Sequence, residues 1–215
     1  YLGKIDPFAT LQGLLTLPFS ELRKDLAKEG GAFVKDLLIS AGAARQLVKA
    51  CKTQGIDHIH AHSCGRAALI VALAHRMGGP SYSVTLHGPL SDYGPGQGFK
   101  WRKAAFATVI TKKLLGEIEA QICSDLPARI EIRPMGVDTD VMTRTEPYQP
   151  ASTDRPIRVF ACGRLNIVKG HQDLLAAIRI LRDQGLDVRL DIAGEDDDGG
   201  NGYHRVLAAK VQELG

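Results

Sequence analysis

The hydrophobic positions in the first part of the chain follow helical and strand spacings in turn. Residues 32–54 carry apolar side chains three and four positions apart and are followed by Gly55, which predicts a helix ending at the glycine. Residues 56–62 and 80–88 have the pattern of short strands, and the apolar stretch 64–79 between them predicts a helix. This order, with short connections, is typical of a parallel sheet with right-handed crossovers.

The pattern continues after one interruption. Residues 88–98 break every period, and their glycine and proline content predicts a mobile loop. A helical turn or two is expected over 99–106, and a strand followed by a helix over 107–122. Residues 129–142 have the pattern of a strand that runs into a turn. The first part of the chain is therefore expected to hold four strands.

A segment without an apolar pattern divides the chain. Residues 143–156 contain three prolines, so we assign them as a linker between an N-terminal domain, 1–142, and a second domain, 157–215. The second domain repeats the order of the first but is too short to close a sheet, so the class is α/β with an incomplete second lobe. Its expected elements are a strand at 157–162, a helix at 170–184, a strand at 186–193 with one wet face, and a helix at 202–214.

Composition narrows the class of protein without deciding it. The 215 residues are 44% hydrophobic and 24% charged, as in ordinary globular proteins. No apolar run approaches the ~20 residues of a membrane-spanning helix. The net charge of +3 is too small to indicate nucleic-acid binding. The four cysteines lack paired spacings, which favours free thiols in a reducing compartment over a metal site or a disulfide framework.

Two cations follow the first strand of the second domain. The apolar run 157–162 stops at Gly163, Arg164 comes next, and Lys169 lies just before the following helix. Ligands of open parallel sheets bind beyond the carboxyl ends of the strands. Arginine offers phosphate a planar fork, lysine a compact charge, and the helix N-terminus amide donors. This pattern predicts a diphosphate site; the alternative is a pair of solvated loop cations.

Histidines gather around the first two strands. His58, His60 and His62 alternate, so all three point to one face of a strand. Three metal ligands so close together on one strand are sterically awkward, and buried, hydrogen-bonded histidines are the favoured interpretation. His87 closes the second strand, where it either contacts a ligand in a cleft between the lobes or caps the strand.

Three more patterns have both a functional and a structural interpretation. The acidic run 194–202 contains Asp-x-Asp, which suits Mg²⁺, but a turn capped by Asp198 or Asn201 is favoured. Residues 99–106 mix a tryptophan with lysines and an arginine, which fits either contact with an acidic membrane surface or a solvated helix face. The glycines of 88–98 follow a loop rather than a strand, so they are weak evidence for a dinucleotide site.

Several stretches together resemble the family 4 glycosyltransferases, retaining enzymes with the GT-B fold. The matching stretches are DHIHAH (57–62), VTLHG (84–88), RPMGVDTDVM (133–142), VFACGRLNIVKGHQDLLAAI (159–178) and LDIAGED (190–196). They occur in the family's order and cover most of the chain from about residue 30. The resemblance implies two Rossmann-like lobes facing across a cleft, with the donor mainly on the C-terminal lobe and the acceptor mainly on the N-terminal lobe.

The resemblance also implies roles for individual residues. Arg164 and Lys169 match the pair that neutralises the donor diphosphate, and Gly163 and Gly194 fall in the same donor-binding stretches. His87 matches the histidine that contacts the donor sugar near its reacting carbon. The family needs no metal and no cofactor, because cations and helix amides meet the charge of a nucleoside-diphosphate sugar, which is the donor substrate.

The sequence departs from the family pattern in three places. Residues 136–138 match the turn into the interdomain segment, but Met135 stands where an asparagine is common. The family's Gly-rich loop would precede Tyr1, and its Glu-x₇-Glu motif would follow Gly215. We therefore expect a piece of a longer protein with little activity of its own. An incomplete second sheet exposes an edge and apolar surface, which predicts self-association.

The resemblance implies transfer of a sugar from a nucleotide-sugar to a glycan or lipid-linked acceptor, with retention of configuration, in bacterial polysaccharide synthesis. The expected location is the cytoplasm, with peripheral contact at the inner face of the membrane left open, and no nucleic-acid partner is expected. Two alternatives stay open. One is a nucleotide-sugar epimerase, which shares the lobed fold; the other is a non-catalytic module that binds a ligand or another protein.

Overall fold

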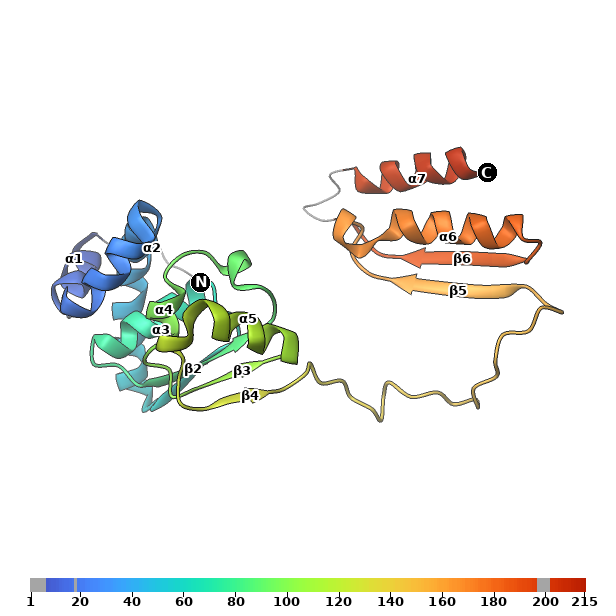
Figure 1. The fold of residues 1–215 in the computed structure, drawn as a ribbon. Coiled ribbons are helices and arrows are strands. Elements are labelled where there is room, and N and C mark those ends of the chain that lie inside the picture. Colours follow the sequence, from blue (N-terminus) through green and yellow to red (C-terminus); the bar gives the residue numbers. More distant parts are fainter. Residues whose placement is uncertain (1–6, 18, 197–201) are drawn as a thin grey trace. The chain divides into compact units, whose positions relative to one another are not determined.

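The chain forms two compact units. The computed structural model describes residues 7–17, 19–196 and 202–215, and it divides into unit 1, Tyr1–Asp138, and unit 2, Thr139–Gly215. Both units are α/β, each with one small sheet of parallel strands (Figure 1). No helix in the described part of the chain is long and apolar enough to cross a membrane.

Unit 1 is built on a four-stranded parallel sheet in the order β1-β2-β3-β4. The strands are β1 (His58–Ala61), β2 (Ser81–Leu86), β3 (Phe106–Val109) and β4 (Ile130–Ile132). Strands that follow one another in the sequence are neighbours in the sheet, and Val84 of β2 lies opposite both Ala61 and Ala107. The four predicted strands of this part of the chain are confirmed, although they are shorter than the sequence patterns that predicted them.

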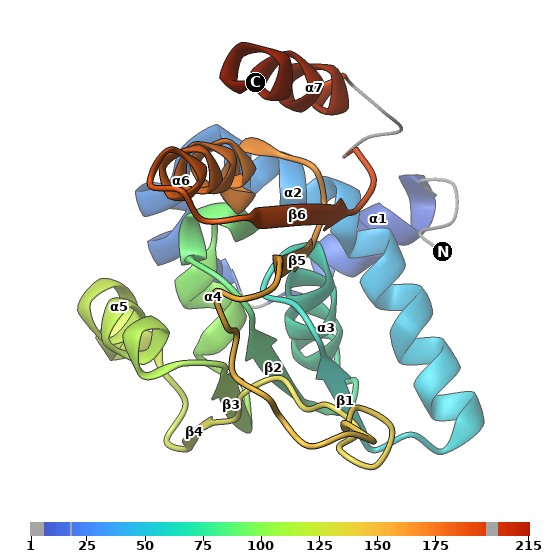
Figure 2. The same ribbon diagram turned by 90° about the vertical axis from the view of Figure 1, so that its right-hand side faces the viewer.

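Five described helices accompany this sheet: α1 (Pro7–Leu15), α2 (Phe19–Gln54), α3 (Arg66–Arg76), α4 (Gln97–Trp101) and α5 (Lys112–Ile122). Figures 1 and 2 show α3, α4 and α5 on the same face of the sheet. The expected helix 32–54 is the C-terminal part of α2, which is interrupted at Gly30, where φ is 64°. At the start of α5 the Thr111 side chain accepts a hydrogen bond of 3.2 Å from the Leu114 N–H.

The two faces of the sheet differ in character. Tyr82, Val84 and Leu86 of β2 are fully buried beneath the helices. Because side chains alternate along a strand, Ser83 and Thr85 point to the opposite face, against which no described helix of unit 1 packs. Parallel sheets are usually apolar on both faces. The polar side chains of Ser83 and Thr85 are therefore consistent with a face that no described helix of unit 1 covers.

The predicted loop 88–98 is a packed segment rather than a free one. It contains the 3₁₀ turn η1 (Leu90–Tyr93) and the start of α4. The side-chain nitrogen of Gln97 lies 3.1 Å from the carbonyl oxygen of Tyr93 and 3.3 Å from that of Cys64, so it ties the segment to the loop before α3. Gln97 is itself buried. The segment is thus not an irregular loop throughout, and these contacts connect it to the rest of unit 1.

The cation-rich stretch 99–106 is not a surface patch. Trp101 is 0% and Lys100 is 1% exposed. The Lys100 ammonium donates a 2.8 Å hydrogen bond to the Tyr93 carbonyl, and the Trp101 indole N–H donates to the Gln97 side chain at 3.3 Å. Both expected interpretations, a membrane contact and a solvated helix face, are wrong for these two side chains. The tertiary hydrogen bonds explain why a lysine is tolerated there.

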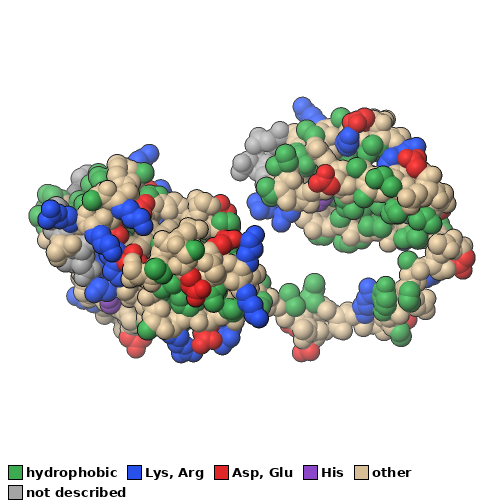
Figure 3. All heavy atoms as spheres, viewed as in Figure 1, with side chains coloured by type: hydrophobic (Ala, Val, Ile, Leu, Met, Phe, Trp, Pro, Cys, Tyr) green, Lys and Arg blue, Asp and Glu red, His purple; other side chains and the backbone are tan. Residues whose placement is uncertain are grey.

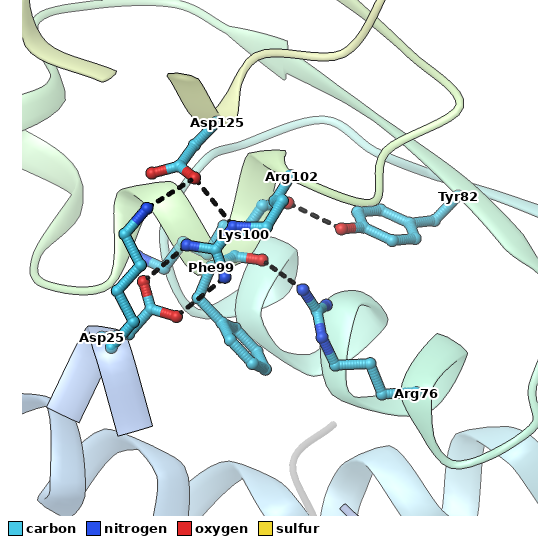
Figure 4. A network of polar contacts seen from close by, with 8 residues as sticks. Asp25, Arg76, Tyr82, Phe99, Lys100, Arg102 and Asp125 are labelled. Carbon is cyan, nitrogen blue, oxygen red and sulfur yellow. Dashed lines mark hydrogen bonds and ion pairs between the residues drawn. The ribbon is translucent and has the colours of Figure 1, made fainter. Parts of the chain in front are cut away.

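A charged network fixes the end of α4 to α2. Arg102 donates two hydrogen bonds of 3.0 Å to the Asp25 carboxylate and one of 2.7 Å to Asp125 (Figure 4). Both carboxylates are buried, and the hydrogen bond to Asp25, helped by Asp125 and opposed by burial, raises the pKa of Arg102. Nearby, Arg76 donates to the Phe99 carbonyl and lies 3.8 Å from the centroid of its ring. Helices α2, α3 and α4 are thus joined by polar as well as apolar contacts.

Unit 2 repeats the strand–helix order on a smaller scale. Strands β5 (Ile157–Cys162) and β6 (Val188–Ala193) pair in parallel, and α6 (His171–Asp183) contacts α7 (Tyr203–Leu214). In β6 the charged residues Arg189 and Asp191 are exposed, which confirms the predicted wet face. Residues 133–156 contain no helix or strand.

Unit 2 has little core. Four residues are buried among those described in this unit: Leu165, His171, Val188 and Leu207. Phe160 of β5 is 69% exposed, and hydrophobic side chains form much of the visible surface of this unit (Figure 3). The described sheet has two strands, so each has one neighbour only. The expectation of an exposed edge and apolar surface is confirmed for this part of the chain.

Candidate functional site

The backbone at the ends of β5 and β6 forms a closely packed platform. Beyond the strands, Gly163 N–H donates to the Ala193 carbonyl at 3.0 Å and Leu165 N–H donates to Glu195 at 2.8 Å. A Cβ on Gly194 would overlap the carbonyl oxygen of Gly163, so position 194 has no room for a side chain. The two candidate glycines therefore lie side by side at the carboxyl end of the sheet.

Arg164 and Lys169 extend from this platform. Arg164 directly follows Gly163, Lys169 ends the 3₁₀ turn η3 (Ile167–Lys169), and both side chains are exposed. A Cβ on Gly163 would meet the aliphatic stem of Lys169 at 3.9 Å, so this stem passes over the glycine. The structure thus brings Gly163, Gly194 and Lys169 together, with Arg164 on the same loop. This is the carboxyl end of parallel strands, where α/β proteins bind their ligands.

Helix α6 begins next to these residues. Gly170 precedes it in the left-handed conformation, with φ at 67°. The first amides of a helix have no partner within the helix and carry the positive end of its dipole. Asp173 already places a carboxylate in this first turn, 3.8 Å from where a Cβ of Gly170 would lie. Affinity for an anion here therefore depends mainly on the two cations.

His171 is a residue of this site that sequence reasoning missed. It is 4% exposed, and its Nε2–H donates a 3.2 Å hydrogen bond to the carbonyl oxygen of Arg164. The contact holds the backbone of the cation-bearing loop against the first turn of α6. Its position in the sequence could have identified it, because a histidine directly after the glycine that starts a helix can form a hydrogen bond to the preceding loop.

The acidic run after β6 has a structural role in its described part. Asp196 accepts backbone hydrogen bonds from Gly202 at 3.1 Å and from His204 at 2.7 Å, and so caps the start of α7. Asp198 and Asn201, named above as possible caps, lie outside the described residues, and Asp198 is also the second acid of the Asp-x-Asp pattern. For Asp196 the turn interpretation is confirmed.

His87 lies in unit 1, directly after β2. Its Nε2 atom is 2.8 Å from Nδ1 of His62, and the two rings stack with centroids 4.6 Å apart. His87 is half-buried and His62 is exposed. Neither side chain is a simple strand cap, because their bond joins the ends of two neighbouring strands, β1 and β2. One ring donates this hydrogen bond and the other accepts it, and each ring has a second nitrogen that does not take part in it.

The other strand histidines are held by hydroxyl groups. The rings of His58 and His60 bond to Ser81, Ser83 and Thr85 of β2 at 2.7 to 2.8 Å. Thr85 bonds in turn to Thr108 of β3 at 2.6 Å. This confirms the hydrogen-bonded interpretation, but His60 is exposed rather than buried. Partial desolvation and the charges of its neighbouring histidines lower the pKa of His60.

Residues 136–138, expected at the turn into the interdomain segment, belong to no helix or strand, and Val137 is 68% exposed.

Comparison with models of known protein families gave no match, and a search of the curated proteins found no similar sequence. Every functional argument about this chain therefore depends on its own residues. The strongest of these is the platform of Gly163 and Gly194 with the two cations Arg164 and Lys169, because it places chemistry suited to a phosphate group where open parallel sheets bind ligands.

Proposed function

We propose that this chain is part of a retaining glycosyltransferase of the GT-B fold that uses a nucleoside-diphosphate sugar as donor. The observation that carries the proposal is the position of Arg164 and Lys169 at the carboxyl end of β5, beside the start of α6. The bare backbone of Gly163 and Gly194 lets a diphosphate approach closely. We assign donor binding to unit 2 and acceptor binding to unit 1, as in the family that the chain resembles.

The chemistry requires charge stabilisation more than acid–base catalysis. When the bond between the anomeric carbon and the diphosphate breaks, negative charge grows on the departing phosphate oxygens. A guanidinium, an ammonium and helix amides stabilise this charge more strongly in the transition state than in the ground state. The sugar then passes to a glycan or lipid-linked acceptor with retained configuration, a reaction suited to polysaccharide synthesis and requiring no metal.

His87 would contact the donor sugar near its reacting carbon. Its Nε2 is occupied by His62, so the ring has one nitrogen, Nδ1, to offer a ligand. A hydrogen bond from this nitrogen to a sugar hydroxyl would orient the ring of the sugar. The role is one of binding and orientation, since the departing group is met by the cations of unit 2.

Calorimetric titration of the intact protein against a panel of uridine, guanosine and adenosine diphosphate sugars tests the proposal. Arg164→Ala and Lys169→Ala should each weaken donor binding by about ten- to hundredfold, as expected for a hydrogen bond to a charged group. Arg164→Ala should lower turnover more than it changes acceptor affinity. The matched control is Arg158→Ala, an exposed arginine of β5 that lies 3.5 Å from Asp191.

Four outcomes would contradict the proposal. One is an equal loss of donor affinity in Arg164→Ala and Arg158→Ala, and another is the failure of every sugar nucleotide to bind. The third is product analysis that finds an isomerised sugar nucleotide in the absence of any acceptor, which would identify an epimerase. Binding without turnover in the intact protein would favour a non-catalytic module.

A further inference from the structure

A second surface in unit 1 has the composition of a ligand site. A groove of about 500 Å³ runs between α1 and the C-terminal half of α2. Grooves of this size are in the range that binds small ligands. Its walls combine three apolar side chains and three cations: Phe8, Val48, Met77, Arg45, Lys49 and Lys52.

The cations of this groove have no carboxylate partner among the described residues. Arg45, Lys49 and Lys52 are four and three residues apart, which places them on one face of α2. No ion pair joins any of the three to a carboxylate in the described part of the chain. Residues 7–17 and 37–54, which build the two walls, contain no Asp or Glu. The groove is therefore suited to a negatively charged partner.

Apolar side chains project from α1, and one of them, Phe8, lines the same groove as the cations. Phe8 is 68%, Leu11 57% and Leu15 77% exposed. Their spacing of three and four residues puts them along one side of the helix. Figure 3 shows Lys and Arg side chains gathered on the part of unit 1 that holds α1 and α2. Exposed apolar residues of this size, grouped with cations, indicate a surface that another phase or molecule covers.

We propose that this α1–α2 surface, made of Phe8, Leu11, Leu15, Arg45, Lys49 and Lys52, binds the face of an anionic lipid bilayer. The nine residues of α1 are too few to span a membrane but enough to lie in its interface. The apolar side chains enter the boundary of the acyl chains, and the three cations contact lipid phosphates.

A bilayer fits these residues better than an acidic protein does. Leu11 and Leu15 protrude from the helix and do not line the groove, and a deformable acyl phase accepts such side chains without a matching cavity. The three cations line the groove together with Phe8 of the same helix. This surface is also separate from the stretch 99–106, where Lys100 and Trp101 are buried. The inference is independent of the proposed sugar transfer.

Vesicle flotation tests the proposal. The protein should float with vesicles of phosphatidylcholine and phosphatidylglycerol in equal parts, stay behind with pure phosphatidylcholine, and be released by high salt. Arg45→Gln with Lys49→Gln should lower the partition coefficient by about thirtyfold, because each basic residue near an anionic surface contributes about a fivefold gain. Leu15→Ser should lower it about tenfold through lost burial of its side chain.

The matched control is Lys112→Gln with Lys113→Gln, which removes the same charge from exposed positions of α5 in the same unit. This variant should bind vesicles as the wild type does. Buried Trp101, the single tryptophan, reports by its fluorescence that every variant is folded. An equal loss in the control, binding insensitive to Arg45 and Lys49, or no binding to anionic vesicles overturns the proposal. So does binding to poly-glutamate in place of vesicles, which would indicate an acidic protein partner.

Discussion

The Nδ1 atom of His62 lies 2.8 Å from the Nε2 atom of His87, and the stacked rings connect the ends of β1 and β2. In a parallel sheet these strand ends share one edge, where ligands bind. His62 was grouped with the strand histidines in the sequence, whereas in the structure it supports the ring proposed to contact the donor sugar. His62 is thus a positioning residue for His87.

His62→Ala should leave the His87 ring without its partner at Nε2. We expect the imidazole ¹⁵N resonances of His87 to shift and, in the intact protein, turnover to fall more than donor affinity. His75→Ala is the matched control, because His75 bonds to the Pro80 carbonyl at 3.1 Å and contacts neither ring. Unchanged His87 resonances in His62→Ala would show that the bond does not exist in solution.

Buried Lys100 should make the stability of unit 1 depend on pH. Burial lowers its pKa from 10.5 to about 8. The folded state then releases the proton near pH 8 while the unfolded chain keeps it, so the free energy of unfolding rises with pH above 8. Cys64 opposes this rise above pH 9, because burial raises the pKa of its thiol from 9.0 to about 12.

The effect of Lys100 is therefore best measured between pH 8 and pH 9, where we expect the free energy of unfolding to rise by about 1 kcal/mol. Urea unfolding followed by Trp101 fluorescence measures it for unit 1 alone. Lys100→Met should abolish the rise, and Lys35→Met, at an exposed position, should preserve it. A rise that persists in Lys100→Met would assign it to another group.

Removing Arg102 should strongly destabilise unit 1. Arg102→Met removes the partner shared by the buried carboxylates of Asp25 and Asp125 and leaves Asp125 with Lys24 at 3.9 Å, at a cost of about 3–5 kcal/mol in the free energy of unfolding. Arg129→Met, which breaks the exposed pair with Glu131, should cost less than about 1 kcal/mol. Similar losses of unfolding free energy in the two variants would mean that water reaches the contacts of Arg102 with Asp25 and Asp125.

The same network predicts sensitivity to acid. Burial alone would raise the pKa of Asp125, but the hydrogen bond and charge of Arg102, with Lys24 and Lys28, lower it below 3.8. A carboxyl with a lowered pKa stabilises the fold above its unfolded pKa and loses this contribution as pH falls through its folded pKa. The difference in stability between wild type and Arg102→Met should therefore shrink in acid, as measured by urea unfolding at a series of pH values.

Gly194→Ala should disrupt unit 2, since the added methyl group would overlap the Gly163 carbonyl oxygen. The strands must separate to admit it, so we expect faster hydrogen exchange in β5, β6 and α6. Gly163→Ala is the control, because its Cβ would meet the flexible Lys169 stem at 3.9 Å. Equal exchange in both variants would contradict the close approach of the two backbones.

Self-association is expected to involve unit 2. Phe160→Ser should lower the average mass seen in light scattering, because it removes an apolar side chain that is 69% exposed on a sheet whose strands have free edges. Val137→Ser, at a position that is 68% exposed outside any strand, should have little effect. A chain that remains monomeric at all concentrations would refute this prediction.

The sequence predicted elements well where local pattern decides them. Strand 157–162 was predicted with its observed bounds because its run of apolar and β-branched residues ends at a glycine. The first half of α2 was missed, because the glycines at 30 and 31 and the charged residues before them hide its helical spacing. For the candidate site, the position of Arg164 and Lys169 followed from the general rule for parallel sheets.

Burial that depends on distant partners could not be predicted. Lys100 and Trp101 have the pattern of a surface helix, and only Tyr93 and Gln97, brought into place by tertiary packing, show why they are inside. The histidine contacts could have been predicted, because hydroxyl residues alternate at 81, 83 and 85 in register with the alternating histidines of β1. Pairing the two patterns across the sheet would have identified the row.

That row has a fixed direction. The Asp57 carbonyl can only accept, so the Ser81 hydroxyl donates to it, with 3.1 Å between the two oxygens. Ser81 must then accept from His58, which therefore carries a hydrogen on Nδ1. For neutral rings, Ser83 must then donate to His58 and receive from His60, and Thr85 donates to His60. One backbone oxygen thereby sets the tautomers of two imidazoles.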